Sequence, residues 1–295
     1  MYNRQLDTFI KVADCGSFSK AAEELYISSP ALIKQINLLE DNLGFSLFER
    51  NHRGIKLTAA GESLYRDAKY IIKYSKDSLI RAAKAADKSG SVIRIGTSIM
   101  TPPQFVVALW GEIYKRQPDL KFQLISFENT PENAREILSH LGDNIDIVAG
   151  VYDRLLLEDN RCAAFHLKNV PIKCAVSLKH RLALKDKLTL DDLKGENLML
   201  IRRNWNETVD RLRDDIVNNH REINIVDFPF FNVDVFNQCE NGNNILIAID
   251  EWVNVHPLLK IIPVEWDYEL TFGIMHSPEP SEQVKRLIDT VKEIL

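Results

Sequence analysis

The 295-residue sequence lacks the features that mark several classes of protein. It has four cysteines, Cys15, Cys162, Cys174 and Cys239, and no two of them stand in a CxxC spacing. We therefore expect free or buried thiols rather than a disulfide framework or a zinc site. No apolar run approaches the roughly 18–20 residues that span a bilayer. Residues 1–7 also lack the basic and then apolar pattern of a secretory signal, so a cytoplasmic location is predicted.

Signatures of catalysis are missing as well. The sequence contains no GxGxxG, GxxxxGK[ST], HExxH or GxSxG motif. The seven histidines are scattered, without the spacing of metal ligands. Adjacent carboxylates such as Asp191 and Asp192 are typical of solvated helix surface, because neighbours on a helix point in different directions. We therefore predict no catalytic residue, no cofactor and no metal ion.

The net charge of −5 is an average over two unlike parts of the chain. Residues 1–90 carry 14 Lys and Arg against 11 Asp and Glu, a net +3, and the remainder carries 23 against 31, a net −8. The basic segment is compatible with phosphate contact, although an ordinary solvated surface explains so small an excess equally well. The composition is otherwise that of a soluble globular protein, and the length favours about two domains.

Three short helices are predicted before residue 46. The first ends at Gly16, and the third begins after Ser28 or Ser29 with Pro30 in its first turn, where the missing N–H costs nothing. Apolar residues of the third helix recur every three or four positions, which predicts a face turned towards a core. These residues are Leu32, Ile36, Leu39 and Leu43.

A hairpin and a long helix are predicted next. Two short strands, 47–50 and 55–57, flank a turn at 51–54. An amphipathic helix then runs from about Thr58 to Lys88, a rod of roughly 45 Å. Such a rod buries its apolar stripe, and a second copy of the chain is the simplest partner, with the chain's own C-terminal domain as the alternative. The residues expected at the dimer interface are Leu64, Ala68, Ile71, Ile72 and Leu79.

This order of helices and hairpin is the layout of a winged helix-turn-helix, in which the third helix enters the major groove of DNA. With the apolar stripe turned inward, Ile33 can touch a thymine methyl, and Lys34 and Asn37 can reach base edges or phosphates. The N–H groups at the start of the helix suit a phosphate. The candidate DNA-binding residues are Ser28, Ser29, Pro30, Ile33, Lys34, Asn37, Arg50, Arg53 and Lys56. A protein-binding helical domain with these side chains solvated is the alternative.

From residue 92 onwards, signals for strands and helices alternate. Strands are expected at 92–96, 121–127, 145–150, 170–177, 198–201, 223–228 and 244–249, and helices at 103–116, 131–141, 207–219, 233–240 and 282–294. This rhythm predicts a largely parallel sheet with helices on both faces.

Several blocks of residues occur in order along positions 1–61. They are Leu6 and Phe9, the runs GSFSKAAEEL (16–25), SSPALIKQI (28–36) and LGFSLFER (43–50), then Arg53, Leu57, Thr58 and Gly61. In this order they resemble the DNA-binding segment of LysR-type transcriptional regulators. Ser29 stands where that family usually has Gln, and Ile33 where it usually has Ser. The base preference of relatives therefore does not carry over.

The resemblance extends to the end of the chain through 94–97, 141–146 and 180–183. It implies a multidomain protein with a winged helix-turn-helix, a long linker helix, and a two-lobed α/β domain like periplasmic binding proteins, with ligand in the cleft. The implied domains are 1–58 for DNA binding, 59–91 for the dimerisation helix and hinge, and 92–295 for effector binding, in which lobe one is 92–162 with 268–295 and lobe two is 163–267.

The effector is expected at the carboxyl ends of strands, where doubly wound sheets collect their ligands. Hydroxyl and amide side chains follow the first two strands, and Arg202 or Arg203 can clamp a carboxylate, so an anionic effector is one class considered. Each residue alone is compatible with a cap or surface role. The candidates are Thr97, Ser98, Thr101, Asn129, Thr130, Gly150, Arg202, Arg203 and Asn204.

The leading hypothesis is a LysR-type regulator that binds an interrupted palindromic operator as a dimer of dimers, a homotetramer, under control of a small molecule. Its expected partners are double-stranded operator DNA, the effector, other copies of the chain and RNA polymerase, with no membrane. One alternative is a DNA-binding regulator whose cleft is empty and which responds to protein partners or to its own dose. The other is a cytoplasmic solute-binding protein or enzyme with a helical interaction module.

Overall fold

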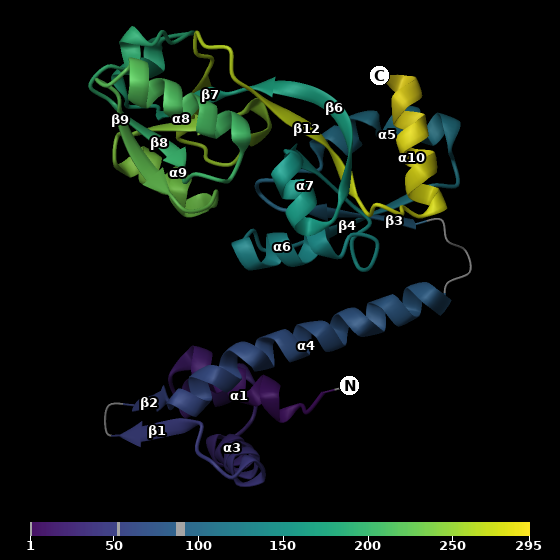
Figure 1. Ribbon diagram of the computed structural model, residues 1–295. Coiled ribbons are helices and arrows are strands. Elements are labelled where there is room, and N and C mark those ends of the chain that lie inside the picture. Colours follow the sequence, from purple (N-terminus) through teal and green to yellow (C-terminus); the bar gives the residue numbers. More distant parts are fainter. Residues whose placement is uncertain (1, 52–53, 87–91) are drawn as a thin grey trace. The chain divides into compact units, whose positions relative to one another are not determined.

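A computed structural model describes residues 2–51, 54–86 and 92–295 of the chain (Figure 1). The chain divides into two compact units, Met1–Lys88 and Ser89–Leu295. Each unit has its own hydrophobic core.

The first unit contains the three predicted helices, the hairpin and the long helix. These are α1 (Gln5–Cys15), α2 (Phe18–Glu24), α3 (Ser29–Leu43), β1 (Phe48–Asn51), β2 (Gly54–Leu57) and α4 (Ala59–Ala86). The Ser28 hydroxyl caps α3 by accepting from the N–H of Ala31. Gly16 and Gly44 end α1 and α3 in the left-handed conformation that glycine adopts without strain. The helix boundaries predicted from caps and glycines are thus confirmed.

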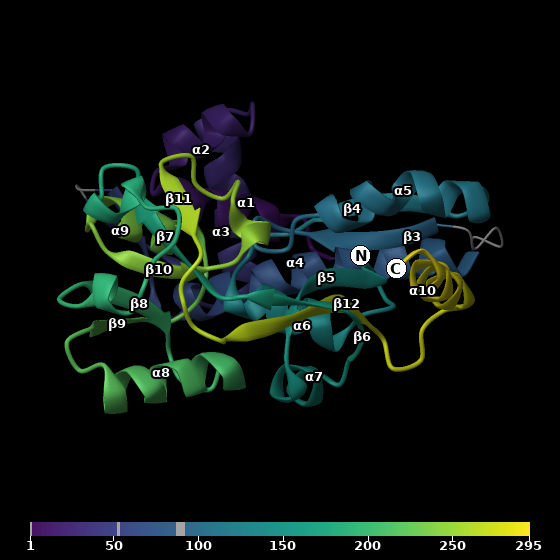
Figure 2. The ribbon, with the colours of Figure 1, turned by 90° about the horizontal axis from the view of Figure 1, so that it is seen from above.

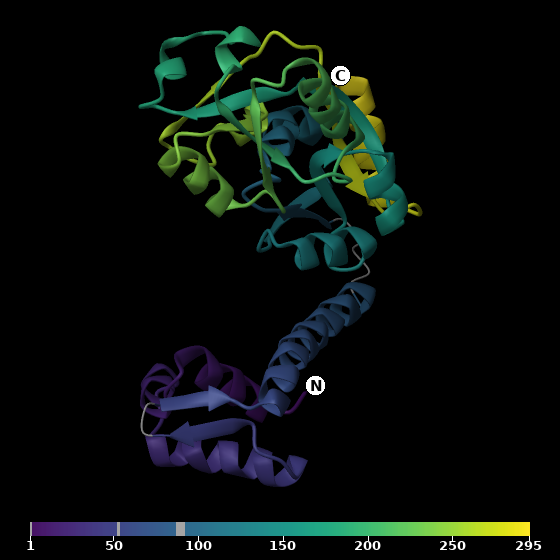
Figure 3. The same cartoon turned by 60° about the vertical axis from the view of Figure 1, so that its left-hand side comes forward.

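The core of this unit lies between α1, α3 and the start of α4. Phe9, Leu32, Ile36 and Ala68 are fully buried in it. Leu43, which we expected on the same face, is 37% exposed, because it is the last residue of α3 and lies beyond the turns that reach the core. Figure 3 shows α4 extending away from the hairpin as one continuous helix, which the structure describes as far as Ala86.

The second unit is built on two five-stranded sheets, one in each lobe. The first has the order β4-β3-β5-β12-β6 and the second β11-β7-β10-β8-β9. The strands of the first sheet are β3 (Val92–Thr97), β4 (Lys121–Ser126), β5 (Ile147–Tyr152), β6 (Ala163–Pro171) and β12 (Glu269–His276). Those of the second are β7 (Lys173–Ser177), β8 (Asn197–Ile201), β9 (Asn224–Phe228), β10 (Ile245–Ala248) and β11 (Leu259–Ile262).

Helices cover both faces of each sheet, as predicted. In the first lobe, α5 (Gln104–Arg116) and α10 (Glu282–Ile294) pack on one face, and α6 (Pro131–Ser139) and α7 (Arg154–Asn160) on the other. In the second lobe, Figure 2 shows α8 (Glu207–Asn219) and α9 (Val233–Asn241) on opposite sides of the sheet. The apolar side chains between these layers form the cores of the two lobes.

Each sheet is mixed, which corrects the expectation of a largely parallel sheet. β3 pairs in parallel with β4 and β5, whereas β12 runs antiparallel to both β5 and β6. The second sheet likewise joins β8, β9 and β10 in parallel and adds β7 and β11 antiparallel. Two of the antiparallel strands, β11 and β12, were not recognised in the sequence, because their sequences do not fit a repeating strand–helix unit.

The strand expected at 170–177 is also corrected, since it is the end of β6 and the whole of β7. Pro171, which has no N–H to donate to a neighbouring strand, marks the break. β6 and β12 pair with each other from Ala163 opposite His276 to Pro171 opposite Glu269. Figure 1 shows these two strands running from one lobe to the other. They are the two crossing strands that hold the lobes together.

Candidate functional site

The exposed side of α3 carries the predicted DNA-reading residues. Lys34 and Asn37 are exposed, Ile33 is half-buried, and the buried Leu32 and Ile36 anchor the opposite side of the helix. Ser28 and Pro30 are exposed at its N-terminus, and Ser29 is half-buried. The arrangement presents one short run of side chains, with the positive end of a helix dipole at its start.

The hairpin supplies the remaining predicted contacts. Lys56 is exposed on β2, opposite Glu49 on β1. The backbone of Arg50 pairs with Ile55 in the same ladder, so position 50 lies beside the tip of the hairpin. Arg53 lies outside the described residues.

Tyr26, in the turn between α2 and α3, was missed by sequence reasoning. Its backbone has a φ of 56°, and its side chain is 95% exposed. The left-handed conformation is uncommon for a residue with a bulky side chain. No Gly or Asn marks this turn in the sequence, so the usual signal for such a conformation is absent.

The residues predicted for the dimer interface fall into two groups. Ala68 and Ile72 are buried in the first unit's own core, and Leu64 packs partly buried against it. Ile71 and Leu79 are 42% and 51% exposed. Only the second group is therefore accessible in the single chain, together with Tyr70 and Tyr74, whose rings stack 6.1 Å apart.

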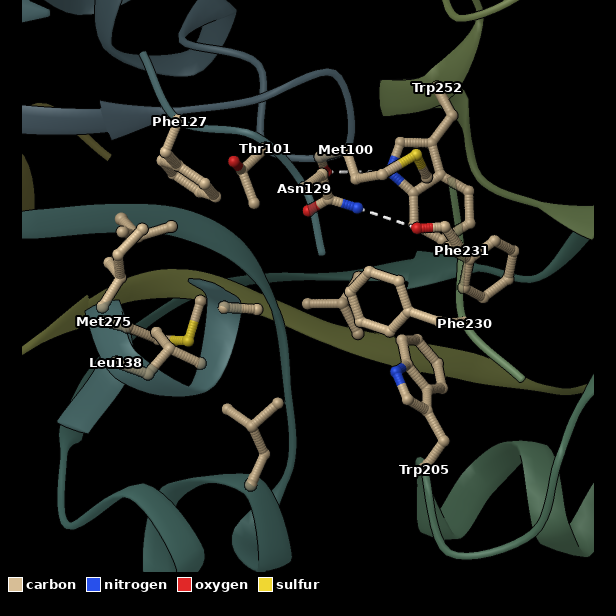
Figure 4. Close-up of a pocket in the computed structure, with 15 residues that line it drawn as sticks. Met100, Thr101, Phe127, Asn129, Leu138, Trp205, Phe230, Phe231, Trp252 and Met275 are labelled. Carbon is tan, nitrogen blue, oxygen red and sulfur yellow. Dashed lines mark hydrogen bonds between the residues drawn. The ribbon is translucent and has the colours of Figure 1, made fainter. Parts of the chain in front are cut away.

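A cavity of about 110 Å³ lies between the lobes of the second unit (Figure 4). Its lining comes from loops at the carboxyl ends of strands, from α6 and α7, and from the sheet of lobe one. The lining residues are Met100, Thr101, Phe127, Asn129, Ala134, Ile137, Leu138, Val148, Val151, Leu156, Trp205, Phe230, Phe231, Trp252 and Met275. None of these fifteen side chains is charged.

Hydrogen bonds join the lobes beside this cavity. The indole N–H of Trp252 donates to the carbonyl of Met100 at 3.1 Å, and the Asn129 side-chain amide donates to the carbonyl of Phe231 at 2.8 Å. Both bonds are visible as dashed lines in Figure 4. Each one ties a loop of lobe one to a loop of lobe two, so the lobes close over the cavity.

A second connection between the lobes uses a carboxylate. Asp153 caps α7 by accepting from the N–H of Leu156 at 2.9 Å, and its other oxygen accepts from the N–H of Glu207 at the start of α8 at 3.1 Å. The neighbouring Arg154 pairs with both Glu158 and Glu207. One carboxylate thus satisfies N–H groups of two helices in different lobes.

The structure brings together only part of the predicted effector site. Thr101 and Asn129 line the cavity, and Ser98 hydrogen-bonds to both of them from behind. A Cβ at Gly150 would meet the Thr101 methyl at 3.3 Å and Met275 at 3.4 Å, so glycine leaves room for these two lining residues. Thr97 is buried in β3.

The other predicted effector residues lie elsewhere. Thr130 caps α6, and Arg202, Arg203 and Asn204 are exposed and do not line the cavity. Arg203 pairs with Asp214 on α8. The predicted arginine clamp is therefore absent from this cavity, because the loop after β8 turns its arginines to the surface and places Trp205 inside.

Four aromatic residues of lobe two were missed: Trp205, Phe230, Phe231 and Trp252. They follow strands β8, β9 and β10, just as the polar candidates of lobe one follow strands of the first sheet. Position after a strand was therefore the signal that could have found them. The predicted candidates at such positions are polar or charged residues and Gly150, and include no aromatic residue.

The described part of the chain offers none of three further features: a metal site, a reactive thiol or a membrane-spanning helix. No group of three His, Cys, Asp or Glu could hold a metal ion there. Burial raises the pKa of the Cys174 thiol, and raises that of Cys239 to about 12, so neither is a ready thiolate nucleophile. Among the described residues, none of the helices combines the length and the apolar character that crossing a bilayer requires.

Comparisons with protein families cover almost the whole chain. The family model described as "Bacterial regulatory helix-turn-helix protein, lysR family" matches residues 3–62, and that described as "LysR substrate binding domain" matches residues 86–295.

Individual relatives match shorter parts. The HTH-type transcriptional regulator TcbR of Pseudomonas sp. (strain P51) is 45% identical over 139 residues, which are 47% of this chain and 42% of TcbR. The HTH-type transcriptional regulator ClcR of Pseudomonas putida is 45% identical over 83 residues, 28% of each chain. The chain thus matches less than half the length of these curated relatives.

The fold is also found among solved structures. The crystal structure of CbnR, a LysR family transcriptional regulator, is similar with a TM-score of 0.64 at 20% identity, covering 99% of both chains. Full-length CbnR complexed with its target DNA is similar with a TM-score of 0.61 at 20% identity, covering 100% of both chains.

Proposed function

This chain belongs to the LysR family of bacterial regulatory helix-turn-helix proteins, and from that premise we propose that it is a sequence-specific DNA-binding transcriptional regulator controlled by a small molecule held between the two lobes. Residues 1–58 bind DNA, 59–91 dimerise, and 92–295 bind the effector. The observation that carries the proposal is the exposed side of α3, which offers Lys34 and Asn37 on a helix whose other side is buried.

Recognition of DNA follows from where these side chains lie. An α-helix fits the major groove, and residues near its N-terminus meet base edges there. Ser28 and Ser29 stand at the positive end of the helix dipole, which suits a phosphate at the helix start. Lys56 on the hairpin supplies a charge for the sugar–phosphate backbone. Full-length CbnR, which has a similar fold, forms a complex with its target DNA, and this supports a DNA partner for the present chain.

Dimerisation through α4 fits the apolar residues that the single chain leaves exposed. Tyr70, Ile71, Tyr74 and Leu79 are 59%, 42%, 55% and 51% exposed. We infer a dimer of dimers, because two or four readers on one operator gain affinity that one small reader lacks. The proposal includes this assembly. It also includes a cytoplasmic location, RNA polymerase as a partner and the absence of catalysis.

DNA binding is tested by fluorescence anisotropy of the full-length protein on a labelled duplex from upstream of its own gene. Lys56→Ala should weaken binding to every duplex about equally and reduce the salt slope by about one, whereas Lys34→Ala should change the preference among sequences. Lys121→Ala, on an exposed strand residue of the second unit, is the matched control and should change neither. The proposal fails if no sequence-specific complex forms at physiological salt.

A further inference from the structure

We propose that the cavity between the lobes takes an uncharged, mainly apolar molecule built around a single ring, and that it rejects carboxylates and phosphates. The inference rests on the proposed function, in which this cavity holds the effector. It goes further by naming the chemical class of the ligand.

The first support is the composition of the lining. Thirteen of the fifteen side chains are apolar or aromatic, and the only two with a hydroxyl or amide are Thr101 and Asn129. An ion that leaves water for such surroundings loses its hydration and gains no counter-charge. A neutral ring gains from the same transfer, because it removes apolar surface from water.

Three Arg and Lys side chains near the cavity form ion pairs with residues outside its lining. Arg203 pairs with Asp214, Arg154 with Glu158 and Glu207, and Lys168 with Glu251. None of these three, nor Arg202, lines the cavity. An anionic ligand would therefore enter without a partner of opposite charge among the described lining residues.

Hydrogen bonds hold the two polar side chains of the lining, Thr101 and Asn129, in place. The Asn129 amide donates to the carbonyl of Phe231 at 2.8 Å, so its oxygen points the other way and accepts from Ser98 at 3.3 Å. Ser98 Oγ also lies 2.8 Å from the Thr101 hydroxyl, where either group can be the donor, and it accepts from the N–H groups of Met100 at 3.3 Å and Thr101 at 3.2 Å. The Thr101 hydroxyl can therefore form a hydrogen bond with a ligand hydroxyl or N–H, but it brings no positive charge for an anionic oxygen.

The shape and size of the cavity favour one ring. Figure 4 shows Trp205 and Phe230 facing the cavity across from Met275 and Leu138. Phe231 packs against Trp205 and Trp252 with ring centroids 5.3 Å and 4.6 Å apart, which makes this side a rigid aromatic wall. The volume of about 110 Å³ is close to the roughly 150 Å³ of an apolar cavity that takes up benzene.

The test compares two probes with the same ring and different charge, benzyl alcohol and benzoate. Full-length protein is titrated with each by calorimetry at neutral pH, and thermal melts are recorded in parallel. We expect saturable binding of benzyl alcohol and at least tenfold weaker binding of benzoate. Equal or tighter binding of benzoate overturns the proposal, and so does the absence of binding by benzyl alcohol.

Variants place the binding in this cavity. Thr101→Val removes the hydroxyl at nearly constant shape, so it should weaken binding of benzyl alcohol several-fold while leaving that of toluene unchanged, and Thr101→Ser should retain binding of the alcohol. Thr271→Val, on β12 away from the cavity lining, is the matched control and should change neither probe. If Thr101→Val does not fold, Ala134→Leu fills the cavity from α6 instead and should abolish binding of all the neutral probes. An unchanged affinity in Ala134→Leu would place the ligand elsewhere.

The same preparations are assayed for DNA binding, which separates the two proposals. If the protein binds DNA but does not prefer benzyl alcohol over benzoate, the proposed ligand class is refuted and the regulator stands. Intact preference for benzyl alcohol without any DNA complex refutes the regulator and leaves the ligand class standing.

Discussion

The two lobes of the second unit share one plan and differ in what they present to the cleft. Starting from edge strand β4 in lobe one and edge strand β9 in lobe two, the strand orders of the sheets are β4-β3-β5-β12-β6 and β9-β8-β10-β7-β11. In both lobes the first parallel strand lies between the other two, and the antiparallel strands follow. The loops that end the parallel strands therefore occupy corresponding places on the two sides of the cleft.

What fills those places is different in each lobe. After β3 and β4, lobe one supplies the only two lining side chains with a hydroxyl or amide, Thr101 and Asn129, which are joined through Ser98, beside the apolar Met100 and Phe127. After β8 and β9, lobe two supplies Trp205, Phe230 and Phe231. Strand topology therefore decides where a ligand is held, whereas the loop side chains decide which ligand is bound.

The largest expected effect concerns the aromatic wall of lobe two. Trp252 is 5% exposed, packs against Phe231 and Phe236, and donates to the Met100 carbonyl. We expect Trp252→Ala to lower the free energy of unfolding by about 3–5 kcal/mol, because it leaves a cavity and an unpaired carbonyl. Urea denaturation followed by circular dichroism measures the change.

The matched variant in lobe one is Trp110→Ala. Trp110 is half-buried and packs edge-on against Phe122 with centroids 4.7 Å apart. Its loss should cost less than half as much as that of Trp252, since less apolar surface is re-exposed from a buried state. Equal costs for the two tryptophans would contradict the asymmetry between the lobes.

The two units differ in how well the sequence located the residues of their candidate sites. The candidate DNA-binding residues of α3 fall within ten consecutive positions, 28–37, so one helical period and a capping serine were enough to place them. The cavity draws on residues from Met100 to Met275, and only the pairing of distant strands brings them together.

Two further misses have local causes. Pro171 divides what looked like one strand into β6 and β7, and the crossing strand β12 was not recognised because it belongs to no strand–helix repeat. Arg202 and Arg203 follow strand β8 as predicted. The residues after them turn so that Trp205, two positions after Arg203, faces the cavity. The rule that ligands gather after strands located the loops and not the side chains that point inward.

A smaller effect is expected where both lobes carry an aspartate after the third parallel strand. Asp153 caps α7 and also accepts from Glu207 of lobe two, whereas Asp250 is exposed and pairs with Lys173. Asp153→Ala should therefore cost about 1–2 kcal/mol, and Asp250→Ala no more than about 0.5 kcal/mol. Thermal melts of both variants at one pH measure the difference. If Asp250→Ala lost more stability than Asp153→Ala, the link through Asp153 would not contribute to closing the lobes.

The smallest effect is expected at Arg203, which the sequence pattern suggested as a carboxylate clamp. Its guanidinium is exposed, and Asp214 raises its pKa by hydrogen bonding and charge. Solvent screens such a pair, so Arg203→Ala should leave the melting temperature nearly unchanged. It should also leave the affinity for benzyl alcohol unchanged, since the side chain lies outside the cavity. If calorimetry showed that Arg203→Ala abolishes binding of an anion while sparing neutral probes, lobe two would recognise its ligand by charge, and the view that it supplies aromatic side chains alone would be wrong.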